Sequence, residues 1–234
     1  MAGVSTIRHE EAAAALGWWL AAGVDTIVDE TPFRWLAPAT PVVPLRAAAA
    51  TEVPVATRAA KTTTAALNVD SLAALAAALA EAHPGALFAD GTPGDAMVVG
   101  ERPSAADLAA GRPFADAAGA LLDRMLAAIQ RSRADTYLAN AVPWGETGRD
   151  ADALPFLRRQ VVLARPKAVL AMGQVATAAL TGATAGIARL RGRWLDCDGV
   201  PVMPTFAPAH LLRQPGHKAL AWADLCAFRA RLAA

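Results

Sequence analysis

The polar side chains of this sequence that could do chemistry stand directly after short apolar runs. Glu101 follows AMVVG, Asn140 interrupts TYLANAV, and His210 comes shortly after VPVMPTF. A carboxylate can transfer a proton or orient water, and a carboxamide both donates and accepts hydrogen bonds. An imidazole can transfer a proton and can also donate or accept a hydrogen bond. A lone asparagine in an apolar strand is unfavourable unless it finds partners, which favours a functional role for Asn140.

The apolar runs have the composition of buried parallel strands, and helical patterns separate them. The runs are 96–100, 136–142, 168–173 and 200–206, and the helical patterns are 118–132, 153–164, 174–182 and 217–233. This alternation predicts an α/β fold, a three-layer α/β/α sandwich with a central, mainly parallel sheet of four strands. Ligands gather at the carboxyl ends of such strands, so the loops GERPS, PWGETGR, GQ and APAHLLR are expected to meet at one site.

The first third of the chain carries little recognisable chemistry. The stretch 10–24 has helical composition, the proline-rich stretch 36–61 is expected to be extended chain or a linker, and a helix is expected over 71–83. We therefore expect an N-terminal helical and Pro/Ala-rich segment, 1–86, packed on an α/β/α domain, 87–234.

The composition favours one globular domain with some irregular chain. Of 234 residues, 55% are hydrophobic and 18% are charged. The net charge of +1 is uneven, because residues 1–89 hold 5 Lys/Arg and 8 Asp/Glu, whereas residues 90–234 hold 17 and 13. The alternating Arg189, Arg191 and Arg193 could form a local polyanion-binding face, although the whole-domain basic excess typical of nucleic-acid-binding proteins is absent.

The sequence also speaks against several other classes of protein. It has no run of about 18 uninterrupted apolar residues and no recognisable leader, so we expect no membrane association and a cytoplasmic location. Cys197 and Cys226 lack CxxC spacing and indicate neither a disulfide framework nor a cysteine-held metal, so we expect no metal and no cofactor. A small-molecule α/β hydrolase is disfavoured because GxSxG and a plausible Ser-His-Asp set are missing.

The order of the motifs resembles the uracil-DNA glycosylase superfamily, especially its family 4 enzymes. The matching stretches are GERPSAADLAAGRPFADAAGALLDRML, YLANAVPW, LPFLRRQVVLARPKAVLAMGQVATAALTG, LRGRW and PTFAPAHLLRQP, within roughly residues 87 to 230. The resemblance implies a DNA repair enzyme that flips uracil out of DNA and hydrolyses its N-glycosidic bond, leaving an abasic site. It implies uracil-containing DNA, single- or double-stranded, as substrate, uracil as product, and a monomer at the bacterial nucleoid. The alternative is a catalytically weak member that binds uracil-containing or abasic DNA.

The same resemblance gives roles to residues that recognise the base. Phe114 of GRPF would stack on the flipped uracil, and Asn140 would hold its edge through the carboxamide. The remaining uracil-binding positions are Gly100, Arg102 and Ala207.

The resemblance also assigns residues to catalysis and to DNA contact. Asp107 stands where family 4 members carry an acid thought to act on the attacking water or the sugar cation, and Glu101 would support it. The loop after the fourth strand would insert a side chain into the gap left by the flipped nucleotide, with one of its two leucines buried under the loop. Its DNA-binding residues would be His210, Leu211, Leu212 and Arg213.

Two departures from family 4 stand out. Those enzymes hold an iron–sulfur cluster on four cysteines, but no cysteine precedes Cys197 here, and packing by Trp144 could replace the cluster's structural role. The motif HPAxLLR reads APAHLLR, so Ala207 replaces the histidine that donates a hydrogen bond to the charged uracil oxygen. Loss of such a donor costs on the order of 100- to 1,000-fold in rate. Either another group such as Arg102 or His210 has taken over, the enzyme is slow, or the chain carries a substitution.

Overall fold

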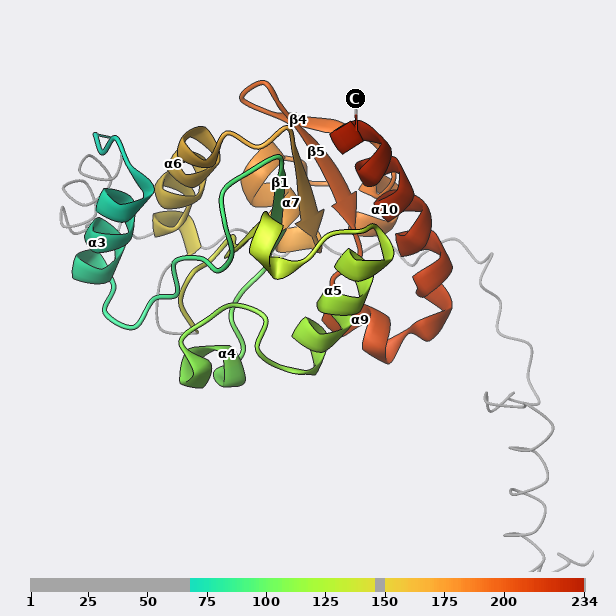
Figure 1. Ribbon diagram of the computed structural model, residues 1–234, viewed down its shortest axis with the longest axis horizontal. Helices are drawn as coiled ribbons and strands as arrows, with labels where there is room; N and C mark the ends of the chain where they lie inside the picture. Colours follow the sequence, from blue (N-terminus) through green and yellow to red (C-terminus); the bar gives the residue numbers. More distant parts are fainter. Residues whose placement is uncertain (1–67, 146–149, 234) are drawn as a thin grey trace, which may run out of the picture. The chain divides into compact units, whose positions relative to one another are not determined.

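Five strands form one sheet in the order β2-β1-β3-β5-β4 (Figure 1). The computed structural model describes residues 68–145 and 150–233, and the predictions for 10–24 and 36–61 lie outside them. The central strands pair in parallel, with Gly100 opposite Asn140 and Met172 opposite Thr205 at their carboxyl ends. The strands are β1 Ala96–Gly100, β2 Thr136–Asn140, β3 Ala168–Met172, β4 Leu195–Cys197 and β5 Val200–Thr205.

Successive residues of each strand face opposite sides of the sheet, and helices cover both sides. Val98, Leu170 and Met203 belong to the apolar cluster under α5 (Ala117–Ala128) and α10 (Lys218–Ala233). Met97, Val169 and Val202 belong to the cluster under α6 (Leu154–Ala164) and α7 (Gln174–Thr181). Burial on both faces explains why these strands read as continuous apolar runs. The predicted three-layer α/β/α fold is confirmed.

The prediction of four strands was wrong, because β4 adds a fifth. β4 pairs antiparallel with β5 through the two-residue turn Asp198-Gly199, whose φ angles of 52° and 88° are both positive. Asp-Gly is the strongest short-range hairpin signal, since a type I′ turn needs positive φ at both central residues. A three-residue edge strand is too short to show alternation, so the turn was the only local sign of it.

The remaining helices are short or pack on another helix and not on the sheet. α3 (Leu72–Ala82) packs on the outer side of α6 (Figure 1), through buried leucines in a cluster with Phe156. Its N-cap is Ser71, whose side-chain oxygen accepts a hydrogen bond from the Ala74 backbone N–H at 3.1 Å. The other helices are α4 (Ala105–Ala110), α8 (Ile187–Leu190) and α9 (Pro208–Arg213). No helix of the described ranges has the length and apolar character that crossing a bilayer requires.

The two cysteines differ in environment, and we expect them to differ in reactivity. Cys197 on β4 is 3% exposed, and burial, helped by Asp198, raises the pKa of its thiol, whereas Cys226 on α10 is exposed. Because the thiolate is the reactive form, a thiol reagent should label Cys226 in the folded protein and Cys197 only after unfolding. Cys226→Ser should remove the fast phase. Equal labelling rates in the native state would contradict the burial of Cys197.

Candidate functional site

A cavity of about 250 Å³ lies at the carboxyl ends of β1 and β3. Its wall combines the loop after β1, α4, the start of α5 and the start of α9. The volume is below the roughly 300 to 1,000 Å³ of drug-sized ligand sites, so it suits a small ring. The structure brings together six of the predicted site residues in its lining, namely Gly100, Glu101, Arg102, Asp107, Phe114 and Ala207.

Phe114 and Asn140 meet at Gly100, the last residue of β1. A Cβ atom placed on Gly100 would lie 2.5 Å from Cζ of Phe114 and 2.6 Å from Oδ1 of Asn140. Only glycine therefore lets the ring and the carboxamide approach the strand end together. Asn140 is 4% exposed, and its Nδ2 has no acceptor among the described residues. A buried N–H without an acceptor costs about 1 to 3 kcal/mol, which points to a ligand with an acceptor.

The Asp107 carboxylate accepts hydrogen bonds from two backbone N–H groups in different segments of the cavity wall. Its Oδ2 accepts from the Ser104 N–H at 2.9 Å, in a capping box that starts α4, and its Oδ1 accepts from the Ala115 N–H at 2.5 Å. The second bond holds the turn at Phe114, whose φ of 56° is unusual for an aromatic residue. Such backbone costs on the order of 1 to 3 kcal/mol and persists only where its surroundings hold it. Asp107 thus lines the cavity and also fixes its aromatic wall.

Glu101 caps a helix as well as lining the cavity. Its Oε1 accepts from the Val175 backbone N–H at 2.9 Å, in the first turn of α7. The preceding Gly173 has φ 99°, and a Cβ there would lie 2.5 Å from Cδ of Glu101. A carboxylate is favourable at a helix N-terminus because of the exposed N–H groups and the helix dipole. The carboxyl end of β3 is thereby anchored to that of β1.

Arg102 joins two loops at the mouth of the site. Its Nη1 donates to the Gly145 carbonyl at 2.5 Å, and its Nη2 donates to Asp150 Oδ1 at 2.6 Å. The guanidinium therefore links the loop after β1 to the chain after β2. This leaves a partly exposed positive charge in the cavity wall.

The sequence prediction missed a third carboxylate, Asp116. It lines the cavity and is the N-cap of α5, where its Oδ1 accepts from the Gly119 N–H at 3.0 Å. Its Oδ2 accepts no hydrogen bond from the described residues, so one oxygen remains free for a ligand or water. Its place directly before a helical pattern was the available signal, because aspartate is a preferred N-cap.

The cavity lining contains Ala207 but not His210. Nε2 of His210 lies 2.7 Å from Nδ1 of His217, and both rings stack with Phe206 at centroid distances of 4.9 and 4.8 Å. The possibility that His210 supplies the missing imidazole is therefore not supported by this arrangement. The hydrogen bond and the stacking hold the ring in the loop, outside the cavity wall.

The end of β5, which leads into this loop, is anchored by a buried ion pair. Asp224 of α10 is 1% exposed and accepts from Thr205 Oγ1 at 2.8 Å and from both Nε and Nη2 of Arg191. Burial raises the pKa of the Asp224 carboxyl, and the hydrogen bonds from Arg191 and Thr205 oppose that shift. Arg191 is thus committed to a structural contact, which leaves Arg189 and Arg193 as the exposed members of the arginine series.

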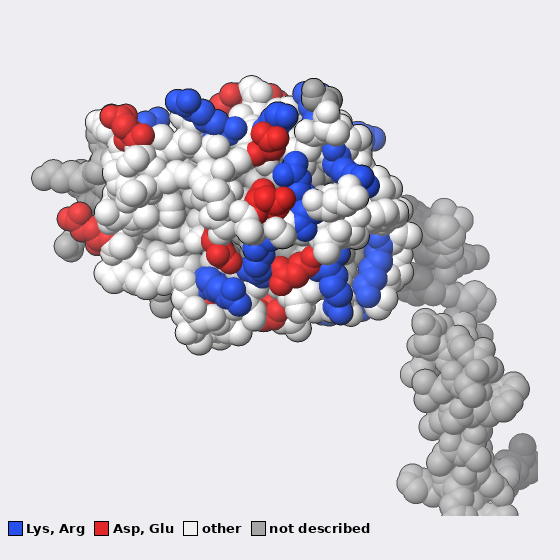
Figure 2. Space-filling view, in the orientation of Figure 1, with Lys and Arg blue, Asp and Glu red and all other residues white. Residues whose placement is uncertain are grey.

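The two leucines of α9 have different environments. Leu211 is 1% exposed and belongs to the core, so this structure does not present it to DNA and its predicted DNA contact is corrected. Leu212 is 41% exposed, and Arg213 is exposed as well. On the face shown in Figure 2, basic and acidic side chains are interspersed rather than gathered by sign. Any attraction to a polyanion on that face is therefore local.

The residues do not fit an iron–sulfur cluster. Such clusters are held by cysteine thiolates, but the chain has two cysteines, one on β4 and one on α10. Trp144, in the loop after β2, is 4% exposed and stacks on His83 with the ring centroids 4.0 Å apart. It shares an apolar cluster with Leu75, Leu79 and Phe156. Side-chain packing stabilises this part of the chain.

Comparison with known proteins defines the class. The sequence profile of the Uracil DNA glycosylase superfamily matches residues 90–226, which is more than half of the chain. The chain therefore belongs to this superfamily, and the match includes the whole cavity wall.

Individual relatives place it near the type-4 enzymes, as the motifs predicted. The Type-4 uracil-DNA glycosylase of Pyrobaculum aerophilum is 31% identical over 150 residues, which cover 56% of this chain and 75% of the relative. The Thermotoga maritima enzyme of the same name is 33% identical over 126 residues, or 50% and 66% of the two chains. The Saccharolobus solfataricus enzyme is 29% identical over 135 residues, or 51% and 62%.

The double anchoring of Asp107 predicts a stability effect. Asp107→Ala removes the acceptors of two backbone N–H groups and should lower the free energy of unfolding by about 1 to 3 kcal/mol. Asp107→Asn keeps one acceptor oxygen and should fall between the alanine variant and the wild type. Urea unfolding measures this, with Asp95→Asn as control, because Asp95 forms only a surface pair with Lys167 at 3.3 Å. An Asp107→Ala protein as stable as the control would contradict the anchoring.

Proposed function

We propose that the protein is a DNA glycosylase that extracts uracil from DNA and hydrolyses its N-glycosidic bond, leaving an abasic site. The observation that carries this proposal is the meeting of the Phe114 ring, which lines a small cavity, and the Asn140 carboxamide, whose N–H has no acceptor among the described residues, at Gly100 of the same lining. A target base inside a duplex cannot be reached without flipping, and a flipped base needs a stacking surface and a partner for its Watson–Crick edge. The Pyrobaculum aerophilum and Thermotoga maritima relatives are named as uracil-DNA glycosylases, which supports the same activity.

Recognition would depend on the carboxamide of Asn140. Uracil presents a carbonyl oxygen beside an N–H, so a carboxamide can donate to the first and accept from the second. Cytosine presents the reverse pattern at the same edge. In this structure Oδ1 of Asn140 lies next to Gly100 and Nδ2 has no acceptor among the described residues, so Nδ2 would donate to the uracil carbonyl. Phe114 would stack on the face of the base.

Bond cleavage would depend on the carboxylates. Negative charge develops on the departing base and positive charge on the sugar. Asp107 would orient the attacking water and stabilise the sugar cation, with Glu101 in support, and Asp116 adds a further carboxylate to the same wall. With Ala207 in place of a donor, Arg102 is the cationic side chain in the described lining that could stabilise the departing base.

DNA contact would fall to the exposed end of α9. Leu212 and Arg213 are exposed, so Leu212 would fill the gap in the stack and Arg213 would meet a phosphate. We also propose that the protein acts as a monomer in the cytoplasm.

A second candidate function is favoured by Ala207. A pocket that can hold uracil but lacks the donor for its developing charge would bind strongly and cleave slowly. The protein would then recognise uracil-containing or abasic DNA without efficient excision.

One assay separates these functions. Oligonucleotides with a single uracil, single- and double-stranded, are incubated with the protein and treated with alkali, and thymine and cytosine versions serve as controls. Strand cleavage at uracil with release of free uracil supports the glycosylase. Selective binding without cleavage supports the second function. A protein that neither cleaves nor selectively binds uracil-containing DNA would contradict both functions.

Changes to Asn140 and Phe114 should weaken excision of uracil. Asn140→Asp should nearly eliminate excision, because a carboxylate only accepts hydrogen bonds and repels the developing anion. Phe114→Ala should remove stacking worth about 1 to 3 kcal/mol. Single-turnover excision rates measure both effects. The other asparagine of the chain, Asn68, is exposed, so Asn68→Asp is the matched control. Excision at wild-type rates by both pocket variants would place the base elsewhere.

Restoring the family imidazole tests the role of Ala207. Ala207→His should raise the excision rate, by up to about 100- to 1,000-fold, and leave DNA affinity within about a few-fold. Ala209→His, two residues further along α9 and also in the cavity lining, controls for the mere presence of an imidazole. An unchanged or lower rate would show that another group has taken over the role. Complete loss of DNA binding would contradict the assignment of this loop.

A further inference from the structure

The aromatic wall of the cavity is built on an unfavourable backbone conformation. Phe114 has φ 56°, in the left-handed region that favours glycine, yet it carries a bulky ring that is 9% exposed. The following amide, that of Ala115, donates to Asp107. The carbonyl side of the turn must be held by a different group, because Asp107 is a hydrogen-bond acceptor.

That group is Arg133, which lies just before β2. Its Nη2 donates to the Phe114 carbonyl oxygen, and its Nη1 donates to the Pro113 carbonyl oxygen at 3.1 Å. The same guanidinium donates from Nε to Asp123 Oδ1 at 2.6 Å and from Nη1 to Asp90 Oδ2 at 2.9 Å. Two carboxylates from different segments therefore fix the guanidinium, and it in turn fixes two consecutive carbonyl groups.

The first turn of α5 closes the remaining side of this turn. A Cβ atom on Gly119 would collide with the carbonyl oxygen of Phe114, so the oxygen rests directly against the helix backbone. The side chain of Arg133 is only 19% exposed, which limits competition from water for its hydrogen bonds. Arginine suits this place because its planar guanidinium presents several donors in fixed directions, which a lysine ammonium cannot do.

We propose that Arg133 is a positioning residue for uracil recognition, acting through Phe114. It holds the turn Pro113–Phe114 so that the ring lies against Gly100 beside the Asn140 carboxamide. Removal of the guanidinium releases the carbonyl groups, and the φ of Phe114 relaxes toward the ordinary region. The ring then no longer forms the stacking wall, although Arg133 itself touches no base. The inference rests on the proposed function for the meaning of the Phe114 ring.

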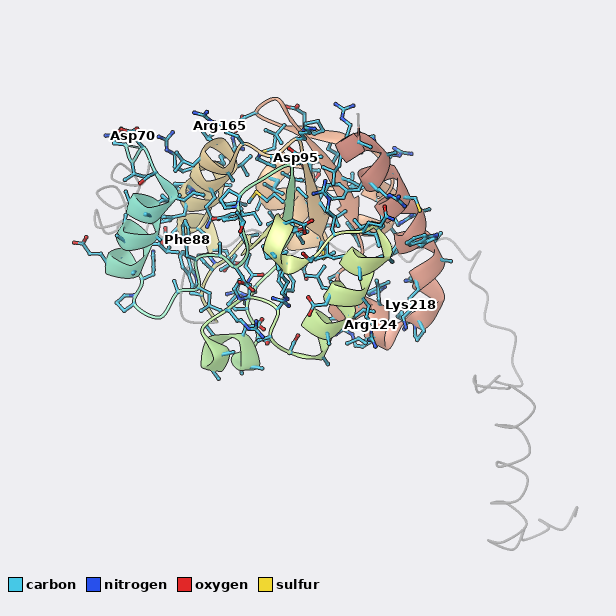
Figure 3. All side chains as sticks on the ribbon, in the orientation of Figure 1. Asp70, Phe88, Asp95, Arg124, Arg165 and Lys218 are labelled. Carbon is cyan, nitrogen blue, oxygen red and sulfur yellow. The ribbon has the colours of Figure 1, made fainter. Side chains whose placement is uncertain are left out.

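The chain offers a matched control arginine. Arg159 of α6 is 22% exposed and donates from Nε and Nη2 to the Val69 carbonyl at 2.8 and 2.5 Å, with Asp70 3.5 Å away. It thus also joins a carbonyl group and a carboxylate, but it is not part of the cavity wall. In Figure 3, Asp70 lies beside α3, at the opposite side of the view from Arg124 of α5.

The test is a double-mutant cycle. Arg133→Gln should lower kcat/KM for uracil excision by about 10- to 100-fold, as expected for a displaced recognition group, while affinity for undamaged DNA stays unchanged. In the Phe114→Ala background the same change should have little further effect, because its target is already gone. Arg159→Gln should leave excision unchanged. Additive losses in the cycle, or equal effects of the two arginine changes, would overturn the proposal.

A second readout does not depend on catalysis. Amide hydrogen exchange over residues 112–116 should accelerate in the Arg133→Gln protein and stay at the wild-type rate in Arg159→Gln. If Arg133→Gln does not fold, Arg133→Lys, which keeps the charge but not the planar donors, replaces it. Unchanged exchange in the turn would overturn the proposal. If the wild-type protein does not excise uracil but the two arginine variants still differ in exchange, the proposed function is contradicted. The role of Arg133 in holding the Phe114 turn is then still supported.

Discussion

The missing side chain of Gly100 is the constraint on which the site depends. β1 ends at this residue, opposite Asn140 on β2, and the Phe114 ring arrives from a separate loop. Any Cβ at this position would occupy the space where the ring and the carboxamide approach one another. The cavity wall is therefore a property of three segments packed at one strand end, and each is held in place by contacts of its own.

Polar contacts between side chains and backbone groups supply part of that support. Asp107 holds the amide side of the Phe114 turn, Arg133 holds its carbonyl side, and Glu101 ties the end of β1 to α7. Each of these side chains satisfies backbone groups that the loops leave without helix or sheet partners. A rigid, slightly strained wall is suited to gripping a base that must be pulled out of a stack. The acids that line the cavity thus serve its architecture, whatever chemistry they also perform.

The two departures from the type-4 pattern have different physical consequences. The two cysteines of the chain do not fit a cluster, and the region around Trp144 is stabilised by packing with His83, Phe156 and the leucines of α3. His210 does not replace the imidazole absent at Ala207, because it is bonded to His217 and stacked on Phe206, which leaves Arg102 as the cationic side chain of the described lining. Structural support can come from many kinds of packing, whereas a donor must be aimed at one developing charge.

The sequence by itself determined the strands β1, β2, β3 and β5, the helices that alternate with them, and the residues that would gather at their ends. Apolar periodicity and chain order carry that information locally, and the motifs carried the superfamily. Only the tertiary structure decided which of two adjacent leucines is buried, that Asp107 and Glu101 are anchors, and that Arg133 supports Phe114. Those outcomes depend on partners far apart in the sequence, such as Glu101 and Val175, 74 positions apart. No local pattern records which distant backbone group a side chain will meet, because packing of the whole sheet brings them together.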